Sequence, residues 1–241
     1  MEYSDKEAKD CGPCPKIALV TANFGGIDCG YGLPEHHGID AFYYTETAGP
    51  WRGGWEVVVT NYPGLDFAPR LKAKYFKQQI WRLPEVAYHD WFVWADSSLM
   101  FKNLSIVSSM VCYMAYGGHR IALVPHPDRK TVGEEYQFII NRMAAGDEYL
   151  KSRYASARMP EQMAEIPPDG RLWCGGFWIM QNSPDTRSFL NDWWDQSIRY
   201  GIMDQLPIDM LLKKHGIEPL PIKVNIYDNE YFKWGGHTGG K

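Results

Sequence analysis

The sequence predicts an α/β fold in which helices flank a mostly parallel, Rossmann-like central sheet. Short apolar runs alternate with longer segments of helical periodicity, and this alternation is typical of strands joined by helices. The run Trp91–Ala95 contains five consecutive apolar residues, which predicts a strand buried on both faces in the middle of the sheet. Because no repeat or convincing linker divides the 241 residues, we expect a polar tail at 1–15 and one domain at 16–241.

The predicted strands are short apolar runs bounded by glycine, proline or polar residues. The first, at 16–21, ends in a glycine-bearing loop at 23–26, where the backbone could approach a ligand closely. Gly175 and Gly176 interrupt a later strand, and glycine inside a strand often marks close approach of a ligand or of another backbone. Beyond the first, strands are expected at 41–45, 56–60, 91–95, 121–124, 172–180 and near 221–227.

Helices are predicted where apolar residues recur at helical spacing. The segment 69–83 begins with a proline, which suits a helix start, and its apolar residues fall on one face. Arg70, Lys74 and Lys77 fall on another face and form a stripe of three cations. A solvated surface and a rim that binds diphosphate both explain this stripe. The other helices are expected at 104–115, from 131 to about 163, at 184–200 and after 204–207.

Asp96 comes directly after the predicted central strand. Ligands of open α/β sheets bind at the ends of the strands, so this carboxylate is a candidate ligand contact, although it could also simply cap the next segment. A carboxylate among oxygen donors suits a divalent cation that carries phosphate. The sequence contains neither a G-x-G-x-x-G fingerprint nor a P-loop. Any phosphate would therefore be held by a metal ion and side chains.

The composition argues against several classes of protein. A formal net charge of −4 gives no general attraction to nucleic acid or to an anionic membrane. No apolar run approaches the roughly 20 residues that span a bilayer, and the polar segment Met1–Asp10 is unlike a secretory signal. We therefore expect no nucleic-acid partner, no membrane span and a cytoplasmic location.

The cysteine and aromatic residues give weaker signals. The five cysteines, at positions 11, 14, 29, 112 and 174, do not resemble a disulfide framework. Cys11 and Cys14 have the spacing of a redox motif, but they precede the first strand, whereas such a motif should follow a strand and open a helix. The aromatic content of 15% only weakly favours a sugar or nucleotide ligand, because tryptophan and tyrosine also fill cores.

Several of these features occur together in a recognisable order along residues 16 to 215. The glycine-bearing loop, the three cations and Trp94-Ala95-Asp96-Ser97 are followed by His126-Pro127-x-Arg129, Glu134-Glu135, the Gly-Gly strand, Trp193-Trp194 and Asp204-Gln205. This order resembles the DUF616 family of GT-A-like glycosyltransferases and the related sugar transferases of large algal viruses. The resemblance implies a GT-A-like domain with a donor half at about 16–125, an acceptor half at about 126–230 and a glycine-rich tail at 231–241.

The activity implied by the resemblance is transfer of a sugar from a UDP- or GDP-linked donor to a glycan or other hydroxyl acceptor. In such folds a D-x-D motif at the end of a central strand holds Mn²⁺ or Mg²⁺ against the diphosphate, often with a C-terminal histidine. Here the motif is Asp96-Ser97-Ser98, which lacks the second acid. The implied metal ligands are Asp96, Ser98 and His237. The implied donor-binding residues are Thr21, Ala22, Phe24, Arg70, Lys74, Lys77, Trp94 and Asp96.

The acceptor side requires groups that position a hydroxyl and, in an inverting enzyme, a carboxylate base. Asp204 is our first candidate for that acid, with Glu134, Glu135 and Asp209 as alternatives. The expected acceptor-binding residues are Gly175, Gly176, Phe177, Glu134 and Glu135. Two other functions remain open: a carbohydrate-binding protein without catalysis, and a metal-dependent hydrolase of nucleotide sugars, which would share the donor site but release free sugar.

Overall fold

The computed structural model describes residues 15–26, 28, 30–47, 53–60, 68–147 and 158–236, and its centre is a seven-stranded sheet. The strand order is β3-β2-β1-β4-β7-β6-β8. Neighbouring strands pair in parallel except at β7, which runs antiparallel to both β4 and β6. The predicted α/β fold with a mostly parallel sheet is thus confirmed. The strands are β1 (Ile17–Asn23), β2 (Ile39–Thr45), β3 (Glu56–Val59), β4 (Trp91–Ala95), β6 (Ile121–Pro125), β7 (Trp173–Gln181) and β8 (Leu220–Pro221).

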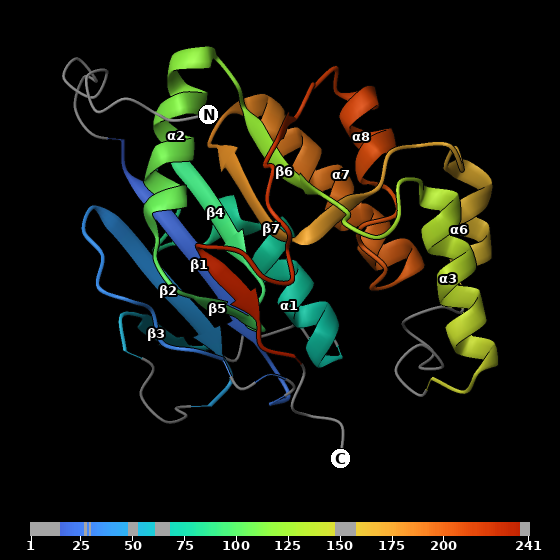
Figure 1. Ribbon diagram of the computed structural model, residues 1–241, viewed down its shortest axis with the longest axis horizontal. Helices are drawn as coiled ribbons and strands as arrows, with labels where there is room; N and C mark the ends of the chain where they lie inside the picture. Colours follow the sequence, from blue (N-terminus) through green and yellow to red (C-terminus); the bar gives the residue numbers. More distant parts are fainter. Residues whose placement is uncertain are drawn as a thin grey trace.

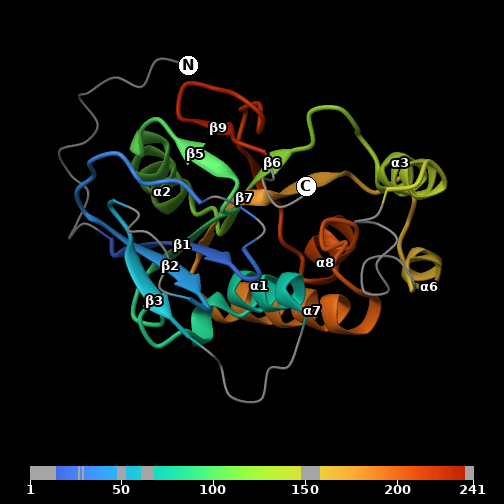
Figure 2. The same ribbon diagram turned by 90° about the horizontal axis from the view of Figure 1, so that it is seen from below.

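Helices cover both faces of this sheet (Figure 1). On one face lie α1 (Pro69–Gln78), α7 (Pro184–Tyr200) and α8 (Ile208–Lys214), with the short 3-10 helix η2 (Ile80–Arg82) after α1. Figure 2 shows the other face, covered by α2 (Ser105–Gly117) and a small two-stranded sheet of β5 (Leu99–Phe101) and β9 (Phe232–Trp234). At the β6 and β7 end lie α3 (Val132–Ala144) and α6 (Met159–Glu165).

The two largest clusters of the described core are apolar layers, one on each face of the central sheet. Successive residues of a strand point to opposite faces, so Val93 packs toward α2 while Phe92 and Trp94 pack toward α1 and α7. Every residue of β4 is buried, as the continuous apolar run predicts for a central strand. This burial on both faces fixes the position of the residues that follow β4.

The strand directions bring several chain segments to one edge of the sheet. The parallel strands β1, β4 and β6 end at this edge, and the antiparallel strand β7 begins there. Phe24, Asp96 and His126 follow the ends of β1, β4 and β6, and Gly175 lies near the start of β7. The edge therefore collects residues that are far apart in the sequence.

The structure differs from the predicted elements near the end of the chain. The expected strand near 221–227 is only the two residues Leu220–Pro221. Part of the expected glycine-rich tail is the strand β9, because Phe232 is fully buried against Phe101 and Phe177. Within the described part of the segment predicted to be helical from 131 to about 163, the structure has α3 and, after residue 158, α6. Among the described helices, none is both long and apolar enough to cross a membrane.

Candidate functional site

A pocket of about 180 Å³ opens at the carboxyl edge of the sheet, between the ends of β1 and β4 and the first turns of α1. Every predicted donor-binding residue except Thr21 lines it. Ser98, a predicted metal ligand, also lines it. The full lining is Ala22, Asn23, Phe24, Asp28, Pro69, Arg70, Ala73, Lys74, Lys77, Trp94, Asp96, Ser97 and Ser98.

Helix α1 supplies the three cations of the pocket. Arg70, Lys74 and Lys77 are separated by four and three residues, so they lie on one helical face that points toward the end of β4. The Lys77 side chain is only 1% exposed. Its Nζ atom lies 5.9 Å from the ring centre of Trp94 and 5.3 Å from that of Trp193. A buried ammonium group needs a carboxylate partner, and Asp204 provides it.

Asp204 forms ion pairs with two of these cations. Its Oδ2 atom lies 2.8 Å from Lys74 Nζ and 2.7 Å from Lys77 Nζ, and the carboxylate is almost fully buried. Trp193 Nε1 donates a hydrogen bond to the Asp204 carbonyl (2.6 Å), which fixes the backbone at this point. Burial by itself raises the pKa of the Asp204 carboxyl, but the two ammonium groups outweigh it and lower the pKa to about 2.

The two lysines respond differently to this shared carboxylate. Burial lowers the pKa of Lys77, and the attraction of Asp204 offsets this effect only in part. Burial also lowers the pKa of Lys74, but Asp204 and Asp96 raise it more, so that its pKa is higher than usual. Lys74, which is also more exposed than Lys77, is therefore a permanent positive charge at the pocket wall.

Asp96 presents its carboxylate to the pocket, as the sequence predicts. Its backbone N–H donates to the Gly176 carbonyl (2.8 Å), and its Oδ1 atom accepts a hydrogen bond from Trp94 Nε1 (2.7 Å). Lys77 Nζ lies 3.9 Å from the same oxygen. The side chain is nevertheless 41% exposed. Asp96 is thus oriented by neighbouring groups and still accessible to a ligand.

A second carboxylate in the pocket, Asp28, was missed by sequence reasoning. It lies two residues beyond the glycine-bearing loop at 23–26 and accepts a hydrogen bond from Ser97 Oγ (2.6 Å). Its backbone carbonyl also accepts a hydrogen bond from Asn23 Nδ2. The available signal was its position just beyond the loop at 23–26, which was predicted to approach a ligand. Asp28 thus links the end of β1 to the Asp96-Ser97-Ser98 motif.

The two glycines of β7 make room for these ionic groups. The register of β6 against β7 shifts between Leu123, which pairs with Trp178, and Val124, which pairs with Cys174. Residues 175–177 of β7 therefore have no paired residue in β6. A methyl group on Gly175 would lie 2.8 Å from Lys77 Nζ, and one on Gly176 would lie 3.1 Å from Asp96 Oδ2. The groups that approach this strand closely are the side chains of Lys77 and Asp96, rather than the ligand or second backbone that the glycines predicted.

The oxygen donors of the pocket fit a hard divalent cation that is bound together with phosphate. The described residues contain no group of three or more His, Cys, Asp or Glu side chains that could hold a metal ion. The pocket does offer the carboxylates of Asp28 and Asp96 and the hydroxyls of Ser97 and Ser98. Mg²⁺ is commonly held by one or two carboxylates plus substrate phosphates. The expected ligand His237 and the Cys11–Cys14 pair lie outside the described residues.

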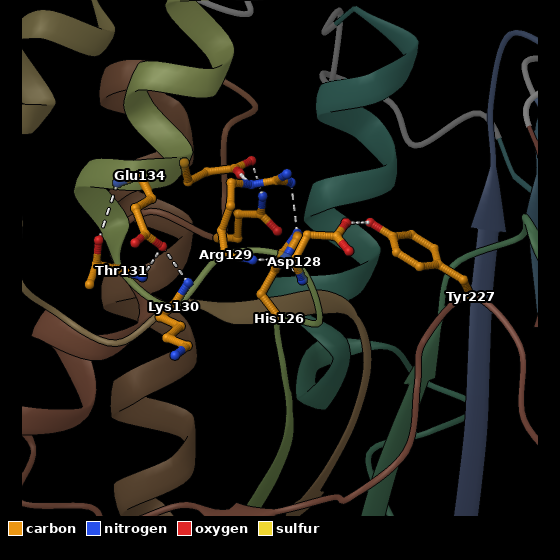
Figure 3. Close-up of polar contacts among 9 residues, drawn as sticks. His126, Asp128, Arg129, Lys130, Thr131, Glu134 and Tyr227 are labelled. Carbon is orange, nitrogen blue, oxygen red and sulfur yellow. Dashed lines mark hydrogen bonds and ion pairs between the residues drawn. The ribbon is translucent and has the colours of Figure 1, made fainter.

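A second polar group, called here the β6 cluster, lies beyond the end of β6 (Figure 3). Glu135 is buried, forms an ion pair with Arg129 and accepts a hydrogen bond from Gln205, which follows Asp204 in the chain. Arg129 also donates to His126 Nε2 (2.9 Å). Burial, and next the Arg129 charge, lower the pKa of His126, so its imidazole is neutral at pH 7. The cluster consists of His126, Asp128, Arg129, Glu135, Gln205 and Tyr227.

Thr21, Phe177 and Glu134 are among the predicted site residues that do not line the pocket. The Thr21 side chain points to the opposite face of the sheet, toward Tyr43 and Trp55. Phe177 is fully buried in the core, so its ring cannot border an acceptor. Glu134 accepts hydrogen bonds from the backbone N–H groups of Lys130 and Thr131 and forms the capping box of α3 (Figure 3). These hydrogen bonds lower the pKa of Glu134, and the residue has a structural role.

The predicted bases are held by other groups. Asp204, with a pKa of about 2 and two lysine partners, is a poor proton acceptor, which corrects its predicted role as a base. Glu135 is paired with Arg129. Asp209 forms an ion pair with Lys213 (2.8 Å) and accepts a hydrogen bond from Trp173 Nε1.

Comparison of the chain with protein-family models and with curated proteins finds no match. Function is therefore inferred from the chemistry of the pocket. Three cations, two accessible carboxylates and two hydroxyls surround a space at the carboxyl edge of an α/β sheet. Such a set can bind a phosphorylated ligand, and it is fixed in place by buried ion pairs.

Proposed function

We propose that the protein is a glycosyltransferase that moves a sugar from a nucleoside-diphosphate sugar to a hydroxyl acceptor. The observation that carries this proposal is the convergence of Arg70, Lys74 and Lys77 with Asp96 in one pocket at the end of the central strand. Glycosyl transfer requires that the negative charge of the leaving diphosphate be stabilised. Cations held in a preformed arrangement stabilise that charge without further reorganisation.

The charges around the pocket favour a diphosphate accompanied by a divalent cation. Among the described residues, three positive side chains, those of Arg70, Lys74 and Lys77, face three carboxylates, those of Asp28, Asp96 and Asp204, so the formal charges of these six groups cancel. The diphosphate of a nucleotide sugar adds two negative charges, and a divalent cation would restore the balance. Asp28 and Asp96 would hold that cation, which when bound would help neutralise the leaving group.

The resemblance to the DUF616 family and the GT-A-like assignment belong to this proposal. Their support is an acid at the end of a central strand that faces a pocket lined by the loop after β1 and by a basic helix. Phe24 stacks on Phe76, with ring centres 5.1 Å apart, and gives this wall a rigid apolar part that suits a nucleoside.

In this proposal Asp204 is a positioning residue. It holds the ammonium groups of Lys74 and Lys77 close together, where mutual repulsion would otherwise separate them. Gly175 allows this arrangement because a larger residue would collide with Lys77. Asp204 therefore does not contact the donor itself but positions the two lysines that do.

Product analysis tests the proposed reaction. The protein would be incubated with UDP- and GDP-sugars and Mn²⁺, with and without oligosaccharide acceptors, and the nucleotide and sugar products quantified. A transferase releases nucleotide in an acceptor-dependent manner and forms an elongated oligosaccharide. Release of free sugar without any effect of an acceptor would instead indicate a nucleotide-sugar hydrolase. Failure to bind or cleave any nucleotide sugar would contradict the proposal.

A further inference from the structure

Two large aromatic side chains are exposed next to the candidate donor pocket. Trp234 of β9 is 45% exposed and Tyr227 is 38% exposed, whereas Trp173, Trp178 and Trp193 are buried. The rings of Tyr227 and Trp234 have centres 6.1 Å apart and are tilted by 55°. We call them the aromatic pair. They leave apolar ring surface open to solvent, where it could contact a ligand.

Backbone hydrogen bonds fix the aromatic pair relative to the pocket. Trp234 N–H donates to the Tyr227 carbonyl (2.7 Å), and Gly235 N–H donates to the carbonyl of Ser98, a residue of the pocket wall (2.7 Å). The Tyr31 hydroxyl donates to the Gly235 carbonyl (3.2 Å). A methyl group on Gly235 would lie 2.1 Å from that hydroxyl, so only glycine fits this contact.

The aromatic pair is also tied to the β6 cluster. Tyr227 donates a hydrogen bond from its hydroxyl to Asp128 Oδ2 (2.8 Å), and Figure 3 shows the tyrosine reaching toward that residue from a separate segment. The pair therefore spans the space between the wall of the donor pocket at Ser98 and the polar groups beyond β6.

We propose that the aromatic pair is the acceptor subsite of the enzyme and packs against a pyranose ring of a carbohydrate acceptor. This inference rests on the glycosyltransferase function proposed above. A pyranose has a flat C–H face that packs on an aromatic ring, while its hydroxyl groups need polar partners at the ring edge. The carboxylate of Asp128 and the hydroxyl of Tyr227 supply such partners. The acceptor in this inference is therefore a glycan. Because the aromatic pair is joined to Ser98 in the pocket wall, a pyranose ring bound to the pair would lie beside the donor pocket.

Direct binding measurements on the Trp234→Ala variant test this inference. Saturation-transfer NMR would measure the affinities of cellotetraose, xylotetraose, mannotetraose and β-1,4-galactotetraose, each with and without UDP or GDP. We expect at least one of them to bind the wild type and to bind Trp234→Ala about tenfold more weakly, with Trp234→Phe in between. Tyr116→Ala is the matched control, because Tyr116 is an aromatic residue that is 96% exposed on α2 and is not part of the aromatic pair. Circular dichroism would verify that all variants fold.

The outcomes separate this inference from the proposed reaction. Equal oligosaccharide binding by wild type and Trp234→Ala, or no binding of any of the four to the wild type, would overturn the acceptor subsite. Normal UDP or GDP binding in Trp234→Ala is expected, because the residue does not line the donor pocket. Trp234-dependent oligosaccharide binding in a protein that binds no nucleotide would support a carbohydrate surface but contradict the transferase.

Discussion

At the scale of single residues, two aspartates of similar appearance in the sequence have different roles. Asp96 follows β4 and is 41% exposed toward the pocket, whereas Asp204 is buried between Lys74 and Lys77. The exposure of Asp96 could be predicted, because it depends on one strand and its end. The ion pairs of Asp204 could not, because they join residues that are 127 and 130 positions apart in the chain.

The Asp96→Asn variant should lose transfer activity and keep its fold. The amide retains an oxygen that accepts the Trp94 hydrogen bond, but the negative charge is lost. Loss of one such electrostatic group lowers turnover by about a hundredfold or more. The control is Asp90→Asn, since Asp90 precedes the same strand at the opposite edge of the sheet. Wild-type turnover by Asp96→Asn would exclude a role for this residue in the reaction.

Asp204 should make stability depend on pH in the acid range. Its pKa of about 2 in the folded protein lies below the ordinary value of about 3.9 in an unfolded chain. A carboxyl group with a lowered pKa stabilises the fold above its unfolded pKa, and this stabilisation disappears as the pH falls from about 4 toward 2. Over this range the free energy of unfolding should fall by about 2 kcal/mol more in wild type than in Asp204→Asn. Urea titrations at several pH values measure the free energy of unfolding of wild type and of Asp204→Asn. Parallel pH profiles of this free energy in the two proteins would refute the ion-pair assignment.

At the scale of elements, the strongest predictions come from regular patterns. The helical spacing of Arg70, Lys74 and Lys77 predicts that they share one face, and all three line the pocket. The strands β5 and β9 were not predicted, because each has three residues and neither shows a pattern by itself. Their pairing depends on the burial of Phe232 against residues distant in the sequence.

Within α1, two lysines should respond differently to substitution. Lys74→Met removes a charge from the pocket, and we expect UDP or GDP to bind about tenfold more weakly because the diphosphate loses an ionic partner. Lys72→Met is the matched control, since Lys72 lies on the same helix but does not line the pocket. Titration calorimetry gives both affinities. Equal losses of nucleotide affinity in the two variants would mean that binding depends only on the overall charge of the helix.

The N-terminal cap of α3 provides a test at a distance from the donor site. The Thr131 hydroxyl accepts a hydrogen bond from the Glu134 backbone N–H, and the Glu134 carboxylate accepts one from the Thr131 backbone N–H. Thr131→Ala should lower the free energy of unfolding by about 1 kcal/mol. Nucleotide affinity should not change, because the described pocket contains no residue of α3. A marked loss of UDP or GDP affinity in Thr131→Ala would indicate that Glu134 contributes to ligand binding.

At the scale of the whole molecule, the site is a consequence of sheet topology. The carboxyl ends of β1 and β4 meet because the strands are parallel neighbours, and α1 packs over β1 so that its basic face borders the same edge. The sequence predicted the sheet and its central strand from apolar runs. It did not predict the antiparallel direction of β7, which brings Gly175 to Lys77, because strand direction is set by packing.

Divalent cations should strengthen nucleotide binding. The charged groups that the structure describes in and beside the pocket balance one another, so a diphosphate bound alone would leave excess negative charge near Asp28 and Asp96. We expect UDP or GDP to bind at least tenfold more tightly with Mn²⁺ or Mg²⁺ than with EDTA, whereas either metal alone binds weakly. Titration calorimetry compares these conditions. Equal nucleotide affinity in EDTA would mean that the cations of α1 hold the diphosphate without a divalent metal ion.

The central claim is that the donor diphosphate occupies the pocket between the end of β1, α1 and Asp96. A crystal structure of the protein with UDP or GDP and Mn²⁺ tests it most directly. The diphosphate should contact Arg70 and Lys74 and lie on the same side of the sheet edge as Asp96. An ordered nucleotide bound elsewhere, with the Asp96 pocket empty, would contradict the claim.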